Sequence, residues 1–599
     1  MRHSLIALAL IAALAGCQKA EPPVTTDTTE AAASAAADTR FAEISTRALE
    51  GWFQNSPVNA TRIGEHRYDQ EIDDLSPAGR AQRLDFGKAI LAELDTLDPA
   101  TLSRENQVDA AILRNRLQSD IWNQETLQSW AWDPQVYSQL AGSALYNLMA
   151  REFAPLHERM QSAIARMEKI PAVLAQGREN LDPGRVPKVH AETAARQNAG
   201  VLNIVKNYIT PHEQSLSPAD RTRLQAATKA LEEAVAEHQA WLDGTLVPNA
   251  NGEFRLGQTL YDQKLQFSLL SSLSRNDIKQ RAEAELARVR DEMYAIAQTV
   301  LKDRPGAPAL PDKPTPEQQQ AAIEAALELA YAEKPARDRV VEEARASLDH
   351  ATAFTREHDL VTVPDSPVQI ILMPEFQRGV AVAYADSPGP LDKGLDTFYA
   401  ISPIPDDWSD EQADSFLREY NDYMIHLLSI HEGVPGHYLE GAHSATHPST
   451  LRAVLRSGPF AEGWAVYTEK MVADAGYLDN DPLFRLVQLK FYLRSVANAI
   501  LDQGVHVDGW DREKAMDLMV RQTFQQESEA AGKWTRAQLT SAQLPTYFVG
   551  AQEHFDMRNA VETKRGEAFD LKAYHDQVLS YGAPPVRFVR QLILEEPIQ

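Results

Sequence analysis

The chain has 599 residues, and 44% of them are hydrophobic, which is enough for a large core and excludes a disordered protein. Its 59 basic and 85 acidic residues give a formal net charge of −26. A surface this acidic repels phosphate backbones, so no nucleic acid partner is expected.

The N-terminus has the pattern of a lipoprotein signal peptide over residues 1–16. After a basic start, Leu5–Leu14 is an apolar run too short to span a bilayer as a mature helix. Leu14-Ala15-Gly16-Cys17 then resembles a lipobox, in which small residues fit the signal peptidase and the cysteine thiol takes the lipid. The alternative is an ordinary signal peptide followed by an incidental cysteine.

Lipidation of Cys17, the only cysteine of the chain, would anchor the mature protein to a membrane. Gln18 follows it where Asp would signal retention, which resembles the outer-membrane sorting pattern of Gram-negative lipoproteins. We therefore expect a periplasmic protein held by lipid at the outer membrane. No later apolar run reaches the roughly 18 residues that a membrane-spanning helix needs.

Residues 17–39 contain almost no large apolar side chains, which predicts a disordered tether, and the folded body is expected to begin near Phe41. From residue 40 to about 300, apolar residues recur at spacings of three and four, as at Leu224, Ala227 and Leu231, and predict an N-terminal helical half. The proline-rich stretch 304–316 predicts a loop at the boundary with a C-terminal half, 301–599.

Pro316 is expected to open a helix that runs to about Glu333. Two short segments beyond it, 368–373 and 379–384, are rich in Val, Ile and Ala and are flanked by proline and glycine. They predict β-strands, with a third at 397–401, and the helical pattern then returns and continues to the end of the chain. The sequence thus predicts a mainly α fold with a small sheet.

The chemistry is concentrated in His431-Glu432-Gly433-Val434-Pro435-Gly436-His437. The preceding residues, from Phe416 on, place apolar side chains on one helical face and predict a helix that ends at His431. In the zincin pattern two histidines four apart bind one metal ion and the glutamate is the general base. Six positions would put His437 roughly 120° around a regular helix from His431. The Pro-Gly pair predicts a distorted or widened turn that brings His437 back.

Glu462, in Phe460-Ala461-Glu462-Gly463-Trp464-Ala465, opens the next apolar-rich helix and is the predicted third ligand. Its separation from His437 is similar to that in gluzincin peptidases, where a glutamate on a neighbouring helix completes the zinc site. Two histidines and one carboxylate leave a position open for water. Glu469, on the same face, is expected to orient a histidine or to form an interhelical salt bridge.

The segments HEGVPGH and EGWAVYTE resemble the bacterial "domain of unknown function 885" family of metallohydrolases. Asp502-Gln503-Gly504-Val505-His506, Gln543 with Tyr547, and 569–575 also match; Glu440 and Ser541-Ala542 depart from the pattern. The resemblance covers about residues 360 to 595. It implies a large helical gluzincin-like fold with a small antiparallel sheet beside the active-site cleft, and one catalytic Zn²⁺.

Several further residues are candidates for roles in such a site. Tyr547 is the first candidate for stabilising an oxyanion, and His506 is a second candidate for that role or for substrate contact. Arg558 is a candidate for binding a substrate carboxylate, and Tyr384 lies on the strand that could hold an extended peptide. Histidines 443 and 447 follow the motif and are expected in a loop or at the surface, with a smaller chance that one of them replaces His437 as ligand.

The expected function is a periplasmic zinc peptidase in which Glu432 takes a proton from the attacking water. Two alternatives remain open. The same ligands would serve a metallo-amidohydrolase that acts on a non-peptide or modified amino-acid amide. A lipid-anchored binding or scaffold protein with an inactive centre is the alternative outside enzymes.

Overall fold

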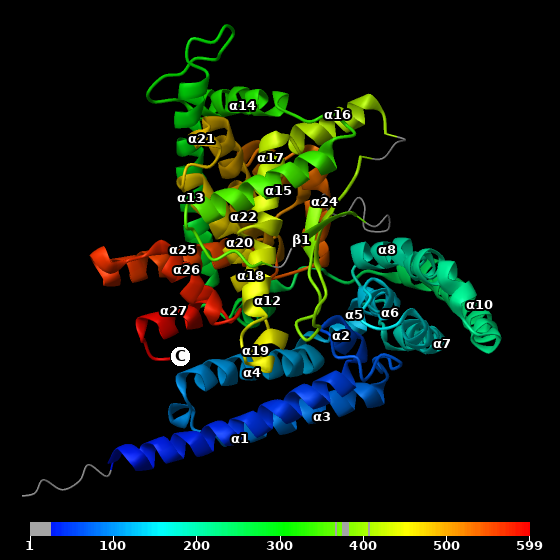
Figure 1. Cartoon of the computed structure of the whole chain (residues 1–599). Helices are drawn as coiled ribbons and strands as arrows, with labels where there is room; N and C mark the ends of the chain where they lie inside the picture. The colour runs from blue at the N-terminus through cyan, green and yellow to red at the C-terminus, as the bar shows by residue number, and fades with distance from the viewer. Residues whose placement is uncertain (1–25, 366–367, 374–382, 405–407) are drawn as a thin grey trace, which may run out of the picture.

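The computed structural model describes residues 26–365, 368–373, 383–404 and 408–599 (Figure 1). Within these ranges the chain is mainly α-helical and carries one three-stranded sheet, as the sequence predicts. The predicted signal peptide and Cys17 lie outside the described residues. In the part of the chain that is described, no helix has the length and apolarity needed to cross a membrane.

The first half of the chain forms a run of helices. They are α1 (Thr26–Asn55), α2 (Pro57–Arg62), α3 (Pro77–Leu94), α4 (Arg104–Trp122), α5 (Ser129–Trp132), α6 (Gln135–Met149), α7 (Leu156–Asn180), α8 (Lys188–Gln197), α9 (Gly200–Ile204), α10 (Pro218–Trp241), α11 (Val247–Asn249), α12 (Gly257–Leu269) and α13 (Arg275–Val300). Helices α1, α3 and α4 lie together at one end of the molecule, and α6, α7 and α10 form a group beside them (Figure 1).

Helix α1 begins before the predicted start of the folded body. The expected tether extended to residue 39, but α1 starts at Thr26. The alanine-rich stretch has high helix propensity, so a lack of large apolar groups does not prevent a helix here. Its later turns are also held by tertiary contacts, because Ala37 packs against the core between α1, α3 and α4, and Asp38 accepts a hydrogen bond from the amide of Ser103.

The second half is also helical outside the sheet. Its helices are α14 (Pro316–Ala332), α15 (Val340–Glu357), α16 (Asp410–Glu419), α17 (Asp422–Leu428), α18 (His437–Ser444), α19 (Thr450–Val454), α20 (Gly458–Asp474), α21 (Tyr477–Asn480), α22 (Pro482–His506), α23 (Arg512–Met516), α24 (Glu527–Leu539), α25 (Pro545–Arg565), α26 (Leu571–Ser580) and α27 (Val586–Leu594). The predicted helix from Pro316 is confirmed as α14, which Thr315 and Gln318 begin with a reciprocal capping box.

One of the two largest cores joins helices from both sides of the proline-rich loop. Residues of α12 and α13, before the loop, pack with those of α14, α22 and α25 after it. A second large core lies between α15, α17, α18, α20, α26 and α27. Helix α22 is buried along most of its length and contributes to both cores. The helices that carry the predicted metal ligands are thus held on two sides.

The sheet contains β1 (Val368–Leu372), β2 (Ala383–Asp386) and β3 (Thr397–Ile401) in the order β1-β3-β2. Strand β2 is antiparallel to β3, but β1 is parallel to β3, so the sheet is mixed and the expectation of a purely antiparallel sheet is wrong. The chain between β1 and β3 is long enough for the crossover that a parallel pair requires. Residues 379–382 of the predicted second strand lie outside the described residues.

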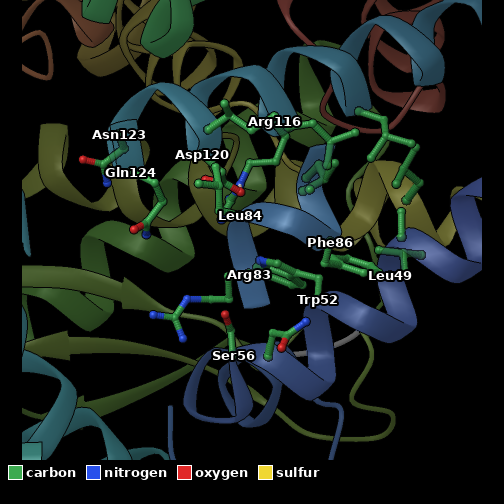
Figure 2. A pocket seen from close by; sticks show the side chains of 18 residues that line it. Leu49, Trp52, Ser56, Arg83, Leu84, Phe86, Arg116, Asp120, Asn123 and Gln124 are labelled. Atoms are coloured by element: carbon green, nitrogen blue, oxygen red, sulfur yellow. The ribbon is translucent and has the colours of Figure 1, made fainter. Parts of the chain in front are cut away.

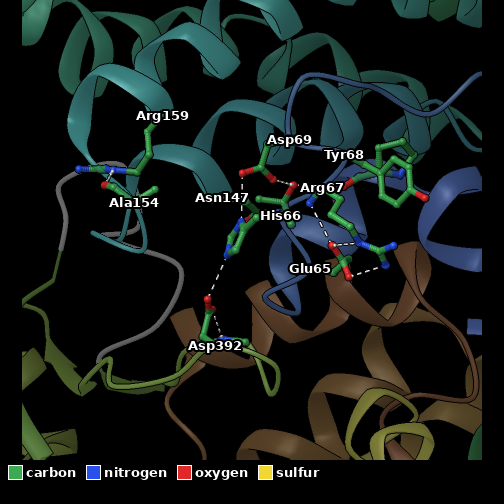
Figure 3. Close-up of polar contacts among 12 residues, drawn as sticks. Glu65, His66, Arg67, Tyr68, Asp69, Asn147, Ala154, Arg159 and Asp392 are labelled. Carbon is green, nitrogen blue, oxygen red and sulfur yellow. Dashed lines mark hydrogen bonds and ion pairs between the residues drawn. The ribbon is translucent and has the colours of Figure 1, made fainter. Parts of the chain in front are cut away.

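The loop between β2 and β3 contacts the N-terminal half through a histidine and two carboxylates (Figure 3). Nδ1 of His66 lies 3.0 Å from a carboxylate oxygen of Asp69, and its Nε2 lies 3.0 Å from one of Asp392 in the loop. The imidazole stacks on the Phe153 ring at 3.7 Å. Arg151 also reaches the carboxylate and carbonyl oxygens of Asp386 at the end of β2. The edge strand is therefore positioned partly by the first half of the chain.

Candidate metal centre

The predicted helix that ends at His431 is interrupted twice. Helix α16 ends at Glu419, and α17 begins anew because the side chain of Asn421 caps it by accepting a hydrogen bond from the amide of Met424 at 3.1 Å. Helix α17 then widens into a π-helical turn at Ser429–Gly433. Such a turn inserts one extra residue and is frequent at functional sites. It carries His431 and Glu432.

The chain reverses between this turn and α18 at Val434-Pro435-Gly436, where the Val434–Pro435 peptide bond is cis. A Cβ at Gly436 would lie 1.9 Å from the carbonyl oxygen of His431, so only glycine allows the two segments to approach this closely. The indole Nε1 of Trp464 donates a hydrogen bond to the Pro435 carbonyl at 2.8 Å. His437 is the first residue of α18 and lies beside His431, with ring centroids 4.8 Å apart.

His431, His437 and Glu462 converge from three elements: the π-helical turn, α18 and α20. Nε2 of His437 lies 3.3 Å from Oε2 of Glu462, and Nε2 of His431 lies 3.9 Å from the same oxygen. One donor atom from each residue lies within 4.8 Å of the others. Donors around a tetrahedral zinc ion, with bonds of about 2.0–2.1 Å, are roughly 3.3 Å apart. Two imidazoles and one carboxylate at these separations fit zinc, and among the described residues this is the one cluster of its kind.

The electrostatics of the cluster also favour a cation. Burial works to lower the pKa of His431, but the hydrogen bond to Glu469 and the charges of Glu432 and Glu462 together raise it to about 9. Burial acts to raise the pKa of Glu462, yet the histidines and then Arg456 hold it below its ordinary value. The carboxylates around the two histidines therefore favour positive charge between them, which a proton or a divalent cation could supply.

Glu469 lies behind His431. Its Oε1 is 2.6 Å from Nδ1 of His431, and both side chains are buried. This leaves Nε2 of His431 facing Glu462. Burial raises the pKa of Glu469, while His431 and Arg494 act in the opposite direction. Arg494 is itself paired with Glu529, and both of these side chains are half-buried, so a series of charges continues from the histidine through Glu469 to this pair.

Glu432 contacts the sheet, and its charge also acts on His431. Its Oε2 accepts a hydrogen bond from the backbone amide of Ala385 in β2 at 2.9 Å. The amide of Ala385 therefore points away from β3, toward Glu432. Residues 383 and 385 share this orientation in an antiparallel pair, so the edge of β2 that no other described strand pairs with faces Glu432. The neighbouring Tyr384 is half-buried, and burial and then the charge of Asp386 raise its pKa to about 12.

Tyr547 lies close to the cluster because α20 and α25 cross at two glycines. A Cβ at Gly463 would lie 2.3 Å from the backbone of Gly550, and no larger residue would allow this crossing. Burial and the charge of Glu462 raise the pKa of the Tyr547 phenol, whose oxygen also contacts Arg536. A phenol with a raised pKa stays protonated and can donate a hydrogen bond.

The structure places His506 and Arg558 away from this cluster, so their candidate roles there are not supported. The ring centroids of Phe491 and His431 are 5.9 Å apart, so this part of α22 lies near the cluster. His506 lies four turns after Phe491 on the same helix, about 22 Å further along its axis. Its Nε2 hydrogen bonds to the carbonyls of Ala537 and Thr540, at 2.8 Å each, which explains why the histidine is buried. Arg558 is three turns beyond Tyr547 on α25, about 16 Å away, near Glu562.

The two histidines after the motif lie outside the cluster as well. His443 donates to the carbonyl of Thr362 at 2.7 Å, and His447 contacts the guanidinium of Arg452. Neither belongs to the group of donors. Glu440, the departure from the family pattern noted above, is buried and pairs with Arg456.

Four groups near the centre escaped sequence reasoning: the amide of Ala385, and the side chains of Arg456, Arg494 and Arg536. A backbone amide has no residue-type signal. The sequence does give a signal for Arg494, because Arg494 and Lys490 are basic residues in a helix that is otherwise largely apolar. A charged side chain on such a helix is expected to have a partner of opposite charge, as Lys490 has in Glu419.

Comparison with known proteins identifies the family of this chain. Residues 57–593 match the family described as "Bacterial protein of unknown function (DUF885)". A solved structure from Shewanella oneidensis, provisionally described as a lipoprotein of unknown function, is 33% identical with a TM-score of 0.80, over 92% of this chain and 99% of that one.

A second solved structure, from Colwellia psychrerythraea and also provisionally described as a lipoprotein, is 17% identical with a TM-score of 0.74, over 93% of this chain and 99% of that one. This likeness concerns the fold alone. A search of curated proteins finds no significant match. The family match covers most of the chain, and the protein is therefore a member of the DUF885 family.

Proposed function

We propose that this protein is a zinc-dependent hydrolase that cleaves peptide amide bonds. The observation that carries the proposal is the convergence of His431, His437 and Glu462, with the carboxylate of Glu432 close enough to His431 for its charge to raise the pKa of that histidine. Such a donor set leaves a coordination position open, as catalytic zinc sites require. A purely structural zinc site would be closed by a fourth protein ligand, and the described residues offer none in this cluster.

Each residue of the site has its own role in the proposed hydrolysis. Zinc held by the three donors would supply a Lewis acid that lowers the pKa of a water molecule toward about 7. Glu432 accepts the proton of the attacking water and passes it to the leaving amine. The amide of Ala385 holds one carboxylate oxygen of Glu432 and leaves the other to take the proton. The phenol of Tyr547 donates a hydrogen bond to the developing oxyanion.

The edge of β2 favours a peptide over other amides. An extended peptide can add to a free strand edge through main-chain hydrogen bonds. Within the described residues, strand β2 is at an edge of the sheet, and the outward-facing amide of Ala385 is bonded to Glu432. A peptide added there would present its scissile bond to the general base.

The proposed location is the periplasm, with the protein anchored by lipid to the outer membrane. Two observations support it: the lipobox-like sequence that ends at Cys17, and the description of the two similar solved structures, both from Gram-negative bacteria, as lipoproteins. Metabolic labelling with palmitate should mark the wild-type protein in the outer-membrane fraction. The Cys17→Ser variant should carry no label.

Metal analysis and the variant Glu432→Gln test the function. The purified protein should bind one equivalent of zinc and hydrolyse members of a peptide library. Glu432→Gln should keep the zinc and lose hydrolysis by about 10² to 10⁴-fold, because only the proton acceptor is removed. Glu411→Gln, at the exposed start of α16, is the matched control and should leave activity unchanged.

Different failures have different meanings. Zinc below about 0.1 equivalent after reconstitution would indicate a binding or scaffold protein. Full zinc occupancy with turnover only on non-peptide amides would retain the hydrolase and reject the peptide substrate. Full turnover in Glu432→Gln would reject Glu432 as the base.

A further inference from the structure

A cavity separate from the metal centre lies between α1, α3, α4 and α19 (Figure 2). Its volume is about 210 Å³, and none of the three metal donors lines it. A single water needs roughly 10–15 Å³ measured in this way, and an engineered cavity of about 150 Å³ in another protein binds benzene. The cavity therefore has room for a small organic molecule.

The walls of the cavity are mostly apolar and are held in place by the surrounding helices. The rings of Trp52 and Phe86 line it together with Leu84, Leu113 and Leu117 (Figure 2). A Cβ on Gly51 would lie 2.1 Å from Cζ of Phe86. The glycine therefore lets α1 and α3 approach closely, with the Phe86 ring packed against Gly51. Leu113 and Leu117 are buried within the same core. Apolar walls of this kind favour an alkyl or aryl group.

Two arginines supply the positive charge at this cavity. Arg83 and Arg116 both line it (Figure 2). Arg116 lies 5.2 Å from the Trp52 ring and pairs with Asp120 at 2.8 Å, where both side chains are largely exposed. Arg83 donates a hydrogen bond to the carbonyl oxygen of Asp74. An anion at this point would gain charge-assisted hydrogen bonds.

A third guanidinium, outside the lining, interacts with Arg116. Arg62 donates to the neutral side-chain oxygen of Asn59, and burial and then the charge of Arg116 lower its pKa. Burial also lowers the pKa of Arg83, although Asp73 and Asp74 act against this effect. The lining itself carries two guanidiniums and the carboxylate of Asp120, so it keeps one excess positive charge in a chain with a net charge of −26.

We propose that this cavity binds a small amphipathic carboxylate. Its apolar tail lies between Trp52, Phe86 and Leu113, and its carboxylate lies at Arg83 and Arg116. The site is independent of the proposed hydrolase activity. It also touches α19, because Leu451 and Leu455 line it, and α19 joins the helices that carry His437 and Glu462.

Calorimetric titration of the whole protein, carrying Cys17→Ser so that no acyl chain of its own competes, tests the proposal. The probes are octanoate, octanol with the same tail and no charge, and acetate with the charge and no tail. Octanoate should bind with a stoichiometry of one and at least ten-fold more tightly than octanol. Acetate should give no measurable binding. Octanol binding as tightly as octanoate, or no saturable binding of octanoate, would overturn the proposal.

Variants locate the site. The pair Arg83→Gln and Arg116→Gln should reduce octanoate affinity to that of octanol. Leu84→Trp, in a half-buried wall, should fill the cavity and abolish binding of both. If that variant does not fold by circular dichroism, Leu113→Phe replaces it. Arg114→Gln, on the same helix but paired with Asp95 and outside the cavity, should leave both affinities unchanged. Octanoate binding to the folded, filled variants at wild-type affinity would contradict the assignment.

Discussion

Nδ1 of His431 lies 2.6 Å from Oε1 of Glu469, with both side chains buried, so the orientation of the proposed metal-binding imidazole is set by a residue that does not reach the metal position. A carboxylate behind a ligating histidine fixes the tautomer and raises the basicity of the ring. The charge of Arg494, which is paired with Glu529, acts on Glu469 from the other side. The affinity of the site for metal should therefore depend on residues behind the ligands.

Glu469→Gln keeps the size of the side chain and a hydrogen-bond acceptor but removes the charge. We expect zinc affinity to fall by about 10 to 100-fold while the fold is retained. Competition with a chromophoric chelator measures this affinity. Asp474→Asn, in an exposed pair at the end of the same helix, is the control and should bind zinc as the wild type does. Wild-type affinity in Glu469→Gln would mean that the carboxylate contributes packing only.

Gly436→Ala should disrupt the chain reversal between the two histidines. The added Cβ would lie 1.9 Å from the carbonyl oxygen of His431 and 2.3 Å from that of Ile430, so the π-helical turn and α18 must move apart. We expect loss of stoichiometric zinc binding and a lower melting temperature, with a cost of about 2–4 kcal/mol. Gly441→Ala within α18 meets only the Ser387 hydroxyl, at 3.9 Å, and should change neither. Retained zinc in Gly436→Ala would show that the reversal tolerates a side chain.

Tyr547→Phe removes one hydroxyl near Glu462 and leaves the ring in its packed position. If the phenol stabilises the oxyanion, kcat should fall by about 10² to 10³-fold with little change in KM or in zinc affinity. Tyr492→Phe, on α22, removes a hydroxyl that bonds Glu285 and Gln552 and is the control for loss of a buried phenol. A rise in KM at constant kcat would instead assign Tyr547 to substrate binding.

The convergence of the metal donors could be predicted from the sequence because the spacing itself excluded a regular helix. Two residues six positions apart, such as His431 and His437, cannot lie on one face of a regular helix. The Pro-Gly pair indicated where the helix would be interrupted. The turn that widens is nevertheless Ser429–Gly433, before the proline. That placement depends on tertiary packing, since a Cβ on Gly433 would lie 2.5 Å from Leu348 of α15. No local pattern contains this contact.

Other misses have similar causes. His506 seemed a candidate for the site because it belongs to a recognisable motif, but its partners, the carbonyls of Ala537 and Thr540, come from a later helix. The start of a new helix at α17 could have been predicted from the sequence, because Asn421 is a typical helix N-cap residue. The parallel pairing of β1 with β3 could not have been predicted, because strand order depends on the path of the chain around the sheet and not on the strand sequences.

The contact between His66 and Asp392 predicts a pH-dependent attachment of the β2–β3 loop. Burial lowers the pKa of His66, but Asp392 and Asp69 outweigh it and raise the pKa to about 9, above the ordinary 6.5. A raised pKa in the folded state means that the stabilisation is complete below about pH 6.5 and is lost as the pH rises through about 9. Glu65 and Arg67 are the charged residues next to it in the chain.

His66→Gln should therefore lower the melting temperature most at pH 6, by an amount equivalent to about 2 kcal/mol, and by progressively less between pH 7 and 10. Thermal unfolding of both proteins across this range measures the difference. His157→Gln, an exposed histidine near Glu158, is the control and should give a small difference at every pH. If the His66→Gln difference were constant with pH, the histidine would act through its stacking on Phe153 and not through its charge. The attachment would then hold the edge strand equally well in acid and base.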